Sequence, residues 1–170
     1  KDSQYDISDQ THITKGILPM PSSDSILLTL NLKEPNIHFS DSCVSMEPVR
    51  GVQSLVYSGL LTYPTPDICP VCGARHASLI RYGTKSSMIV LPKISRMNAY
   101  LRLAKQRWLC RDCGHTFSAS SPVVEKNCFI SENTKLCTIL DSKQQRSQKD
   151  IAGSLNISHG TVNSLLLKTY

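Results

Sequence analysis

The spacing of hydrophobic residues divides the chain into strand-like segments followed by helical ones. Residues 37–46 and 52–63 have the short apolar runs of β-strands, and Pro48-Val-Arg-Gly51 between them predicts a hairpin. Residues 25–33 match the templates of both a helix and a strand, and we favour a short helix. From Ser131 onwards the period becomes helical, with the Ser131 hydroxyl as the expected N-terminal cap.

The middle of the chain predicts further strands at residues 78–82, 88–91 and 99–109, and a short one at 116–119. A glycine follows the first of these strands and a proline follows the second, and both residues are typical of strand ends. This part of the sequence therefore predicts several separate strands joined by turns.

Two short cysteine pairs flank most of these strands, as Cys69-Pro-Val-Cys72-Gly and Cys110-Arg-Asp-Cys113-Gly. Four thiolates are the ligands that tetrahedral Zn²⁺ prefers, so the two C-x-x-C-G units predict a zinc ribbon with four cysteine ligands. The glycine after each pair suits a turn with positive φ. Two disulfides, or one redox dithiol, are the alternatives. His76 and His115 lie close enough in sequence to replace a thiolate, although four cysteines already complete the tetrahedron.

The chain contains seven cysteines, and an odd number argues against a fully paired secreted framework. A reducing cytoplasm, with zinc on four of the cysteines, fits better. The three remaining cysteines occupy apolar segments and are expected to be buried thiols: Cys43, Cys128 and Cys137. Trp108 is the only tryptophan, and we expect it to pack behind the ribbon rather than to stack on a nucleic-acid base.

Residues 147–165 have the apolar spacing of a helix-turn-helix. Ala152 is the small residue expected where the helices cross, and Asn156 is expected in the left-handed turn. Ser158 is expected to cap the second helix. The outer side of that helix would then carry His159, Gly160, Thr161, Asn163, Ser164 and Lys168. In a DNA-binding protein this side meets the major groove. A helical hairpin that only packs in a core is the alternative.

The net charge of +6 is unevenly distributed. Residues 1–66 carry −3, residues 67–126 carry +7 and residues 127–170 carry +2. The basic segment contains the cysteine pairs, which favours a polyanionic partner such as nucleic acid. A solvated lysine-rich surface is the alternative, and Lys85 and Lys93 are expected to be plain surface charges. No apolar run has the length of a membrane span, so no membrane partner is expected.

The order of these motifs resembles the N-terminal part of ISL3-family bacterial transposases. The resemblance covers roughly residues 25–168 and rests on the pattern CPxCG…RWxCxxCGxTF. Arg107-Trp-Leu-Cys110 is its most specific part, followed by residues 123–131 and by Asp150-Ile-Ala152. The resemblance implies that the partner is double-stranded DNA, namely the terminal inverted repeats of a mobile element, and it allows a homo-oligomer in a transposition complex.

The resemblance also implies roles for individual residues. The structural zinc ligands would be Cys69, Cys72, Cys110 and Cys113. Arg102, Lys105 and Arg107 would bind the phosphate backbone, and the helix beginning at Ser158 would read the inverted repeat.

In that family an RNase H-like catalytic domain with three metal-binding carboxylates should follow the helix-turn-helix, whereas this sequence stops at Tyr170. It begins with Lys1 rather than Met, as a fragment or a processed chain would. The isolated acidic residues Asp112, Asp141 and Asp150 do not form a catalytic set, so we expect binding without cleavage and no catalytic residues. The alternatives are a free-standing zinc-ribbon/helix-turn-helix regulator and a zinc-stabilised protein-interaction module.

Taken together, the sequence predicts an α+β fold class in which a β-hairpin region, a four-cysteine zinc ribbon and a helix-turn-helix follow one another. The expected boundaries are a flexible leader at 1–24, a short helix plus hairpin at 25–66, the ribbon at 67–122 and the DNA-binding helices at 123–170.

Overall fold

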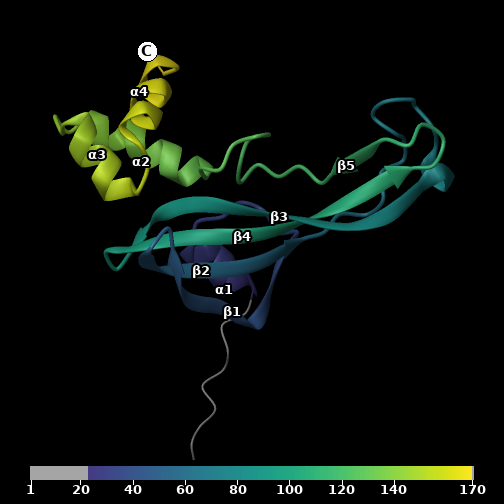
Figure 1. The fold of residues 1–170 in the computed structure, drawn as a ribbon, viewed down its shortest axis with the longest axis horizontal. Coiled ribbons are helices and arrows are strands. Elements are labelled where there is room, and N and C mark those ends of the chain that lie inside the picture. Colours follow the sequence, from purple (N-terminus) through teal and green to yellow (C-terminus); the bar gives the residue numbers. More distant parts are fainter. Residues whose placement is uncertain (1–22, 170) are drawn as a thin grey trace, which may run out of the picture.

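The computed structural model describes residues 23–169, and the expected leader at 1–24 lies outside them except for its last two residues. A short helix, α1 (Ser23–Thr29), comes first, as the sequence favoured, and the strands and the other helices follow it. The strands are β1 (Ile37–Val49), β2 (Val52–Leu61), β3 (Leu79–Ile94), β4 (Met97–Cys110) and β5 (Thr116–Ser118). A 3-10 turn at His76–Ser78 precedes β3, and the helices α2 (Glu132–Ser142), α3 (Gln148–Leu155) and α4 (His159–Leu167) complete the chain (Figure 1).

The predicted hairpin is confirmed, since β1 and β2 pair antiparallel from Ile37↔Leu61 to Val49↔Val52. Its two-residue turn, Arg50-Gly51, has φ of 52° and 81°. Turns with positive φ at both central residues match the right-handed twist of the flanking strands, which explains why a glycine occupies this position.

The predicted strands at 78–82 and 88–91 are not separate. They belong to one strand, β3, which pairs antiparallel with β4 along almost its whole length. The register shifts between Arg81 and Thr84, and again between Leu91 and Ile94. Gly83 and Pro92 therefore lie at bulges inside one strand, where an extra residue bends the strand without ending it.

The predicted fold class, with three modules in series, is wrong. The described residues are rich in β-structure, and the hairpin strands and the ribbon strands form one mixed five-stranded sheet. Its order is β1-β2-β4-β3, and β5 pairs with β4 beyond the end of β2. The joint is a parallel pairing of β2 with β4, from Ser54↔Asn98 to Leu61↔Lys105. Within residues 23–169 the ribbon is thus an extension of this sheet, and the C-terminal helices contact β3 rather than form a separate module.

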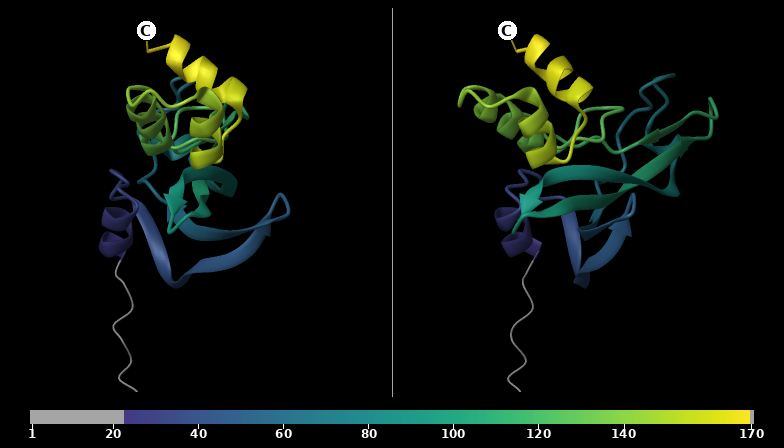
Figure 2. Two further views of the ribbon diagram at one scale, coloured as in Figure 1. Left: turned by 90° about the vertical axis from the view of Figure 1, so that its left-hand side faces the viewer. Right: turned by 60° about the vertical axis from the view of Figure 1, so that its left-hand side comes forward.

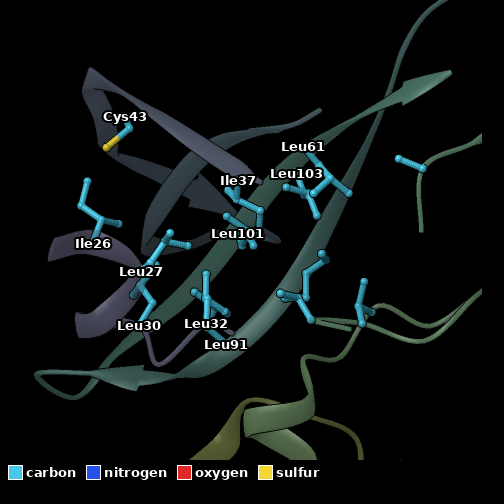
Figure 3. Close-up of a cluster of buried hydrophobic side chains, with 14 of the residues drawn as sticks. Ile26, Leu27, Leu30, Leu32, Ile37, Cys43, Leu61, Leu91, Leu101 and Leu103 are labelled. Carbon is cyan, nitrogen blue, oxygen red and sulfur yellow. The ribbon is translucent and has the colours of Figure 1, made fainter. Parts of the chain in front are cut away.

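The main hydrophobic core lies between α1 and one face of the sheet (Figure 3). Leu101 and Leu103 of β4 and Ile89 of β3 are fully buried, and side chains of α1 cover them. Tyr63 packs against this core, and its hydroxyl donates a hydrogen bond to the buried carboxylate of Glu34. The core is built mainly from leucine and isoleucine side chains that alternate along the strands, as a half-buried strand requires.

The three C-terminal helices pack on one another and lie against the other side of the β3–β4 hairpin (Figure 2). Three side-chain hydrogen bonds within residues 23–169 attach them to the sheet. The Thr134 hydroxyl of α2 donates to the Val90 carbonyl of β3 (3.0 Å). The Asn156 amide donates to the Tyr100 hydroxyl (2.7 Å), and Lys93 Nζ donates to the Gly153 carbonyl (2.8 Å). No helix within residues 23–169 is long and apolar enough to cross a membrane.

The local predictions for these helices are confirmed. Ser131 and Ser158 cap α2 and α4, and each hydroxyl accepts a hydrogen bond from the backbone N–H three residues later. Asn156 ends α3 in the left-handed conformation, with φ 56° and ψ 42°. A short polar side chain tolerates that conformation better than most, so a glycine is not needed here.

Candidate metal centre and nucleic-acid interface

The four paired cysteines lie on two similar turns at the end of the sheet that is remote from α1. Cys69 begins the first turn. Its N–H donates to the Ala74 carbonyl, and the Gly73 N–H donates to the Cys69 carbonyl. Cys110, the last residue of β4, repeats this arrangement with His115 and Gly114. Both glycines have positive φ, 73° and 70°, as the sequence predicted. The β3–β4 pairing, with Leu79 opposite Cys110, brings the two turns together.

The four sulfur atoms form a compact group, all within 4.8 Å of one another. The Sγ atoms of Cys69 and Cys113 are 3.8 Å apart, and those of Cys72 and Cys110 are 3.6 Å apart. A tetrahedral zinc ion with Zn–S bonds of about 2.3 Å holds its sulfur ligands about 3.8 Å apart. The cysteine set therefore fits a structural Zn²⁺. Within residues 23–169 no histidine joins this group.

The polar surroundings of the thiols also favour a cation. The N–H groups of Cys72 and Val71 point at the Cys69 sulfur and lower the pKa of that thiol to about 7. The Ala74 N–H lowers the pKa of Cys72, but hydrogen bonding to the neighbouring thiols outweighs it and raises that pKa to about 12. Four sulfurs this close cannot all carry negative charge without a cation between them. Zn²⁺ resolves this conflict, because a coordinating thiol is deprotonated.

Little apolar surface supports this end of the molecule. Its own core consists of Cys69, Leu79 and Cys110, with Ala74 and Phe117 partly buried against it. Trp108 packs behind the ribbon, as predicted: it is 2% exposed, and its ring lies 5.7 Å from that of Phe117. A side chain so deeply buried offers no platform to a base.

The three β4 cations predicted to bind phosphate do not form one row. Arg102 is an even-numbered residue of the regular strand and projects from the opposite face to Lys105 and Arg107. It is also engaged, because its guanidinium pairs with Glu47 at 2.7 Å. Arg107 lies over the ring of Tyr82, 5.5 Å from its centroid. Lys105 lies directly opposite Lys85 of β3.

On α4 the predicted DNA-contacting residues share one exposed side. Val162 is fully buried against α3, and His159, Asn163, Ser164 and Lys168 are exposed. Thr161 is only half-exposed, and its hydroxyl shares a hydrogen bond with that of Ser158 (2.8 Å). Because α4 packs at the opposite end of the sheet from the cysteines, the predicted residues fall into separate groups (Figure 1).

The acidic residues considered as catalytic candidates are dispersed, and each has a local partner. Asp112 accepts from the Ser78 hydroxyl, Asp141 pairs with Arg146, and Asp150 accepts from the Ser147 hydroxyl that caps α3. Of the other cysteines, Cys43 is buried as expected, whereas Cys128 and Cys137 are half-buried.

Sequence reasoning missed Lys85 and Tyr100. Lys85 is exposed, as expected of a surface charge, but the register also places it opposite Lys105. The Tyr100 hydroxyl accepts a hydrogen bond from Asn156 in the turn between α3 and α4. The register of the β3–β4 pairing puts Lys85 opposite Lys105, and the bulges in β3 hide that register in the sequence.

Comparison with known proteins identifies the ribbon. Residues 65–113 match the family model described as the zinc-finger of transposase IS204/IS1001/IS1096/IS1165. The matched segment begins just before the first cysteine pair and ends at the last cysteine, and it is less than a third of the chain. No curated protein and no solved structure matches the chain. The chain therefore contains a transposase-type zinc ribbon, and such a ribbon is not a catalytic domain.

Proposed function

We propose that this chain is the DNA-binding N-terminal portion of an insertion-sequence transposase and that it recognises the terminal inverted repeats of a mobile element. The observation that carries this proposal is the match of residues 65–113 to a transposase zinc-finger, at four cysteines whose geometry fits Zn²⁺. The charge of +7 over residues 67–126 supports a polyanionic partner. In this proposal residues 67–122 provide the ribbon, and residues 123–170 provide the helices that contact DNA.

The exposed side of α4 is the surface proposed to read bases. Asn163 carries an amide that can bond adenine through two hydrogen bonds, and each good contact of this kind discriminates by about 1–3 kcal/mol. His159, in the first turn of α4, lies where recognition helices meet base edges or phosphates. Thr161, Ser164 and Lys168 complete the proposed surface. The Ser158 cap keeps the first turn of α4 in the helical conformation that this contact needs.

The sheet is proposed to bind the backbone without reading sequence. Lys105 and Arg107 share one face of β4 and can neutralise phosphates. Arg102 is the least suited of the three cations, because Glu47 already neutralises it. Contacts of this kind weaken with salt and position the duplex, whereas base contacts specify it.

We further propose that the chain binds DNA without cutting it. Strand transfer by two metal ions needs carboxylates that hold the ions about 4 Å apart. Asp112, Asp141 and Asp150 lie on different elements and bond to different partners. Incubation with inverted-repeat DNA and Mg²⁺ or Mn²⁺ should therefore leave both strands intact. Nicking by the purified chain that persists through repeated purification would overturn this part of the proposal.

The direct test is binding of the zinc-loaded chain to duplexes made from the DNA that flanks its own gene. The chain should prefer the inverted repeats to a scrambled duplex of the same composition. Asn163→Ala should reduce that preference about tenfold or more while nearly preserving binding to the scrambled duplex. Gln144→Ala, at another exposed polar residue, is the matched control.

Each other outcome has a definite meaning. Preference for promoter-like DNA over the inverted repeats would replace the transposase proposal with a transcriptional regulator. Absence of binding to any duplex at low salt would leave a protein-interaction module and reject the DNA-binding proposal.

A further inference from the structure

Two lysines face each other in the middle of the β3–β4 hairpin. Lys85 and Lys105 are Cα partners in the antiparallel register. Residues directly opposite each other project from the same face, with Cβ atoms about 4.5–5.5 Å apart, and like charges in this position destabilise the sheet. The pairing thus brings two ammonium groups together at a cost to the folded state.

The position of Lys105 makes this cost larger. Lys105 is also the parallel partner of Leu61 on β2 and lies two residues beyond Leu103 on the same face. Both leucines are fully buried, so Lys105 continues the apolar stripe and is itself half-buried. Burial and the charge of Lys85 together lower the pKa of Lys105. Its ammonium is therefore both partly desolvated and repelled.

No carboxylate compensates for this arrangement. Within residues 23–169, neither Lys85 nor Lys105 has a carboxylate oxygen within 4.0 Å. Lys135, a buried lysine with 11% of its side chain exposed, is neutralised instead: it pairs with Glu125 at 2.9 Å and Glu132 at 2.8 Å. Lys105 is partly buried without such a partner, and Lys85 opposite it is exposed to solvent. An external anion can therefore reach the pair from the Lys85 side and neutralise both ammonium groups.

A third cation lies beside the pair. Arg107 is two residues beyond Lys105 on the same face of β4, and the ring of Tyr82 supports its guanidinium at 5.5 Å. Its Nη2 donates a long hydrogen bond to the Thr116 hydroxyl (3.5 Å), and the remaining N–H donors at the edge of the guanidinium can still bind an anion.

We propose that Lys85 and Lys105, with Arg107 beside them, form a phosphate-binding site that takes a phosphate of the nucleic-acid backbone. The nucleic-acid part rests on the proposed function, while the affinity for phosphate does not. Tyr100 and Lys105 differ by an odd number of positions along β4. Because successive side chains of a strand alternate between its faces, the two project from opposite faces. Tyr100 contacts the α3–α4 turn, and the phosphate bound by the lysines is therefore a different one from any that α4 contacts.

The first test uses inorganic phosphate and the full zinc-loaded chain. Thermal melting is compared in phosphate and in chloride at equal ionic strength, for the wild type and for Lys85→Gln. In chloride, Lys85→Gln should melt at a higher temperature than the wild type, because the repulsion is gone. Phosphate should raise the melting temperature of the wild type and of Lys85→Arg, but not that of Lys85→Gln. Lys33→Gln, at an exposed lysine after α1, should behave like the wild type.

Lys85→Gln is thus expected to raise the melting temperature in chloride and to abolish the increase caused by phosphate. Substitution of a lysine with a purely structural role would not produce both effects. A lower melting temperature for Lys85→Gln in chloride, or an equal phosphate response in both proteins, would overturn the proposal.

The second test uses a DNA duplex and measures affinity as a function of salt. Lys85→Gln should bind about tenfold more weakly at low salt, for every sequence alike, and the slope of log K against log salt should fall by about one. Asn163→Ala should keep the full phosphate response. A phosphate response without any DNA binding would support the site and reject the proposed function. DNA binding with an unchanged slope in Lys85→Gln, and no phosphate response, would reject the site and leave the function in place.

Discussion

The two ends of the β3–β4 hairpin are stabilised in different ways, although the same two strands form both. At one end, Leu101, Leu103 and Ile89 are fully buried beneath α1 and the β1–β2 hairpin. At the other end the buried cluster within residues 23–169 has three members, two of them zinc-site cysteines, and Phe117, which contacts Trp108, packs against it. Apolar burial stabilises the first end, and the metal must stabilise the second. A continuous strand therefore does not imply a uniform source of stability.

Removing the metal is the strongest way to test this difference. Zinc binding contributes on the order of 10 kcal/mol to folding in isolated zinc-finger peptides, because the site does not exist in the unfolded chain. Chelation, or Cys110→Ser, should remove zinc from a chain that otherwise holds one ion, and amides near the two turns should lose protection from hydrogen exchange. Amides of β2 and of the adjoining part of β4 should stay protected.

Cys128→Ser, outside the metal group, is the control for this experiment and should retain one zinc per chain. If amides over the whole sheet lose protection equally in Cys110→Ser, the two ends unfold as one unit. The hairpin would then not have one end stabilised by apolar burial and the other by zinc.

The converse change tests the apolar end. Leu101→Ala removes a fully buried side chain from the core and should lower the free energy of unfolding by about 2–5 kcal/mol. Denaturant unfolding measures this loss, and Leu28→Ala, at a residue that is 83% exposed, is the matched control. Equal effects of the two substitutions would mean that the cluster around Leu101 does not carry the stability assigned to it.

One hydrogen bond at the apolar core, from Tyr63 to Glu34, makes the stability of the chain sensitive to pH. Burial raises the pKa of Glu34, but hydrogen bonds from Tyr63 and Asn36 lower it by more, so its net pKa lies below the ordinary value. A lowered pKa in the folded state gives stability that is present above the unfolded pKa, near 4.3, and lost as pH falls through the folded value. Tyr63→Phe removes one of these donors and should cost about 1–3 kcal/mol at neutral pH.

The loss caused by Tyr63→Phe should shrink below about pH 4, where Glu34 becomes protonated in both proteins. Urea unfolding at several pH values measures this difference. Tyr82→Phe, at an exposed tyrosine, should show no such pH dependence. A loss that stays constant from pH 7 to pH 3 would contradict the role given to the Glu34 carboxylate.

The smallest expected effect concerns the attachment of the helices. Tyr100→Phe deletes the hydroxyl that accepts a hydrogen bond from Asn156 and should cost about 1 kcal/mol. Amides of α3 should exchange faster, while those of the sheet should not change. Unchanged exchange in α3 would show that Lys93 and the apolar contacts are sufficient to hold the helices on the sheet.

Residues close together in sequence account for the predictions that were confirmed. The two C-x-x-C-G turns, the caps at Ser131 and Ser158 and the left-handed Asn156 each depend on contacts within a few residues. The zinc ligands could be identified for the same reason, since each turn presents two sulfurs by itself. The division of β3 into two strands was wrong because Gly83 and Pro92, which usually end strands, can also occupy bulges when a long partner strand continues.

The chemistry of short segments can be predicted from sequence: two half-sites for zinc, a hairpin turn within residues 48–51 and the caps of the C-terminal helices. The structure narrows that turn to Arg50-Gly51, because Pro48 and Val49 belong to β1. How these segments combine depends on contacts between distant parts of the chain. The parallel pairing of β2 with β4 replaced three modules by one sheet, and the register of β3 on β4 brought Lys85 to Lys105. The physical reason is the distance in sequence between the interacting residues. Neighbouring residues determine caps and turns, whereas strand pairing and register depend on burying apolar side chains that lie far apart in the chain.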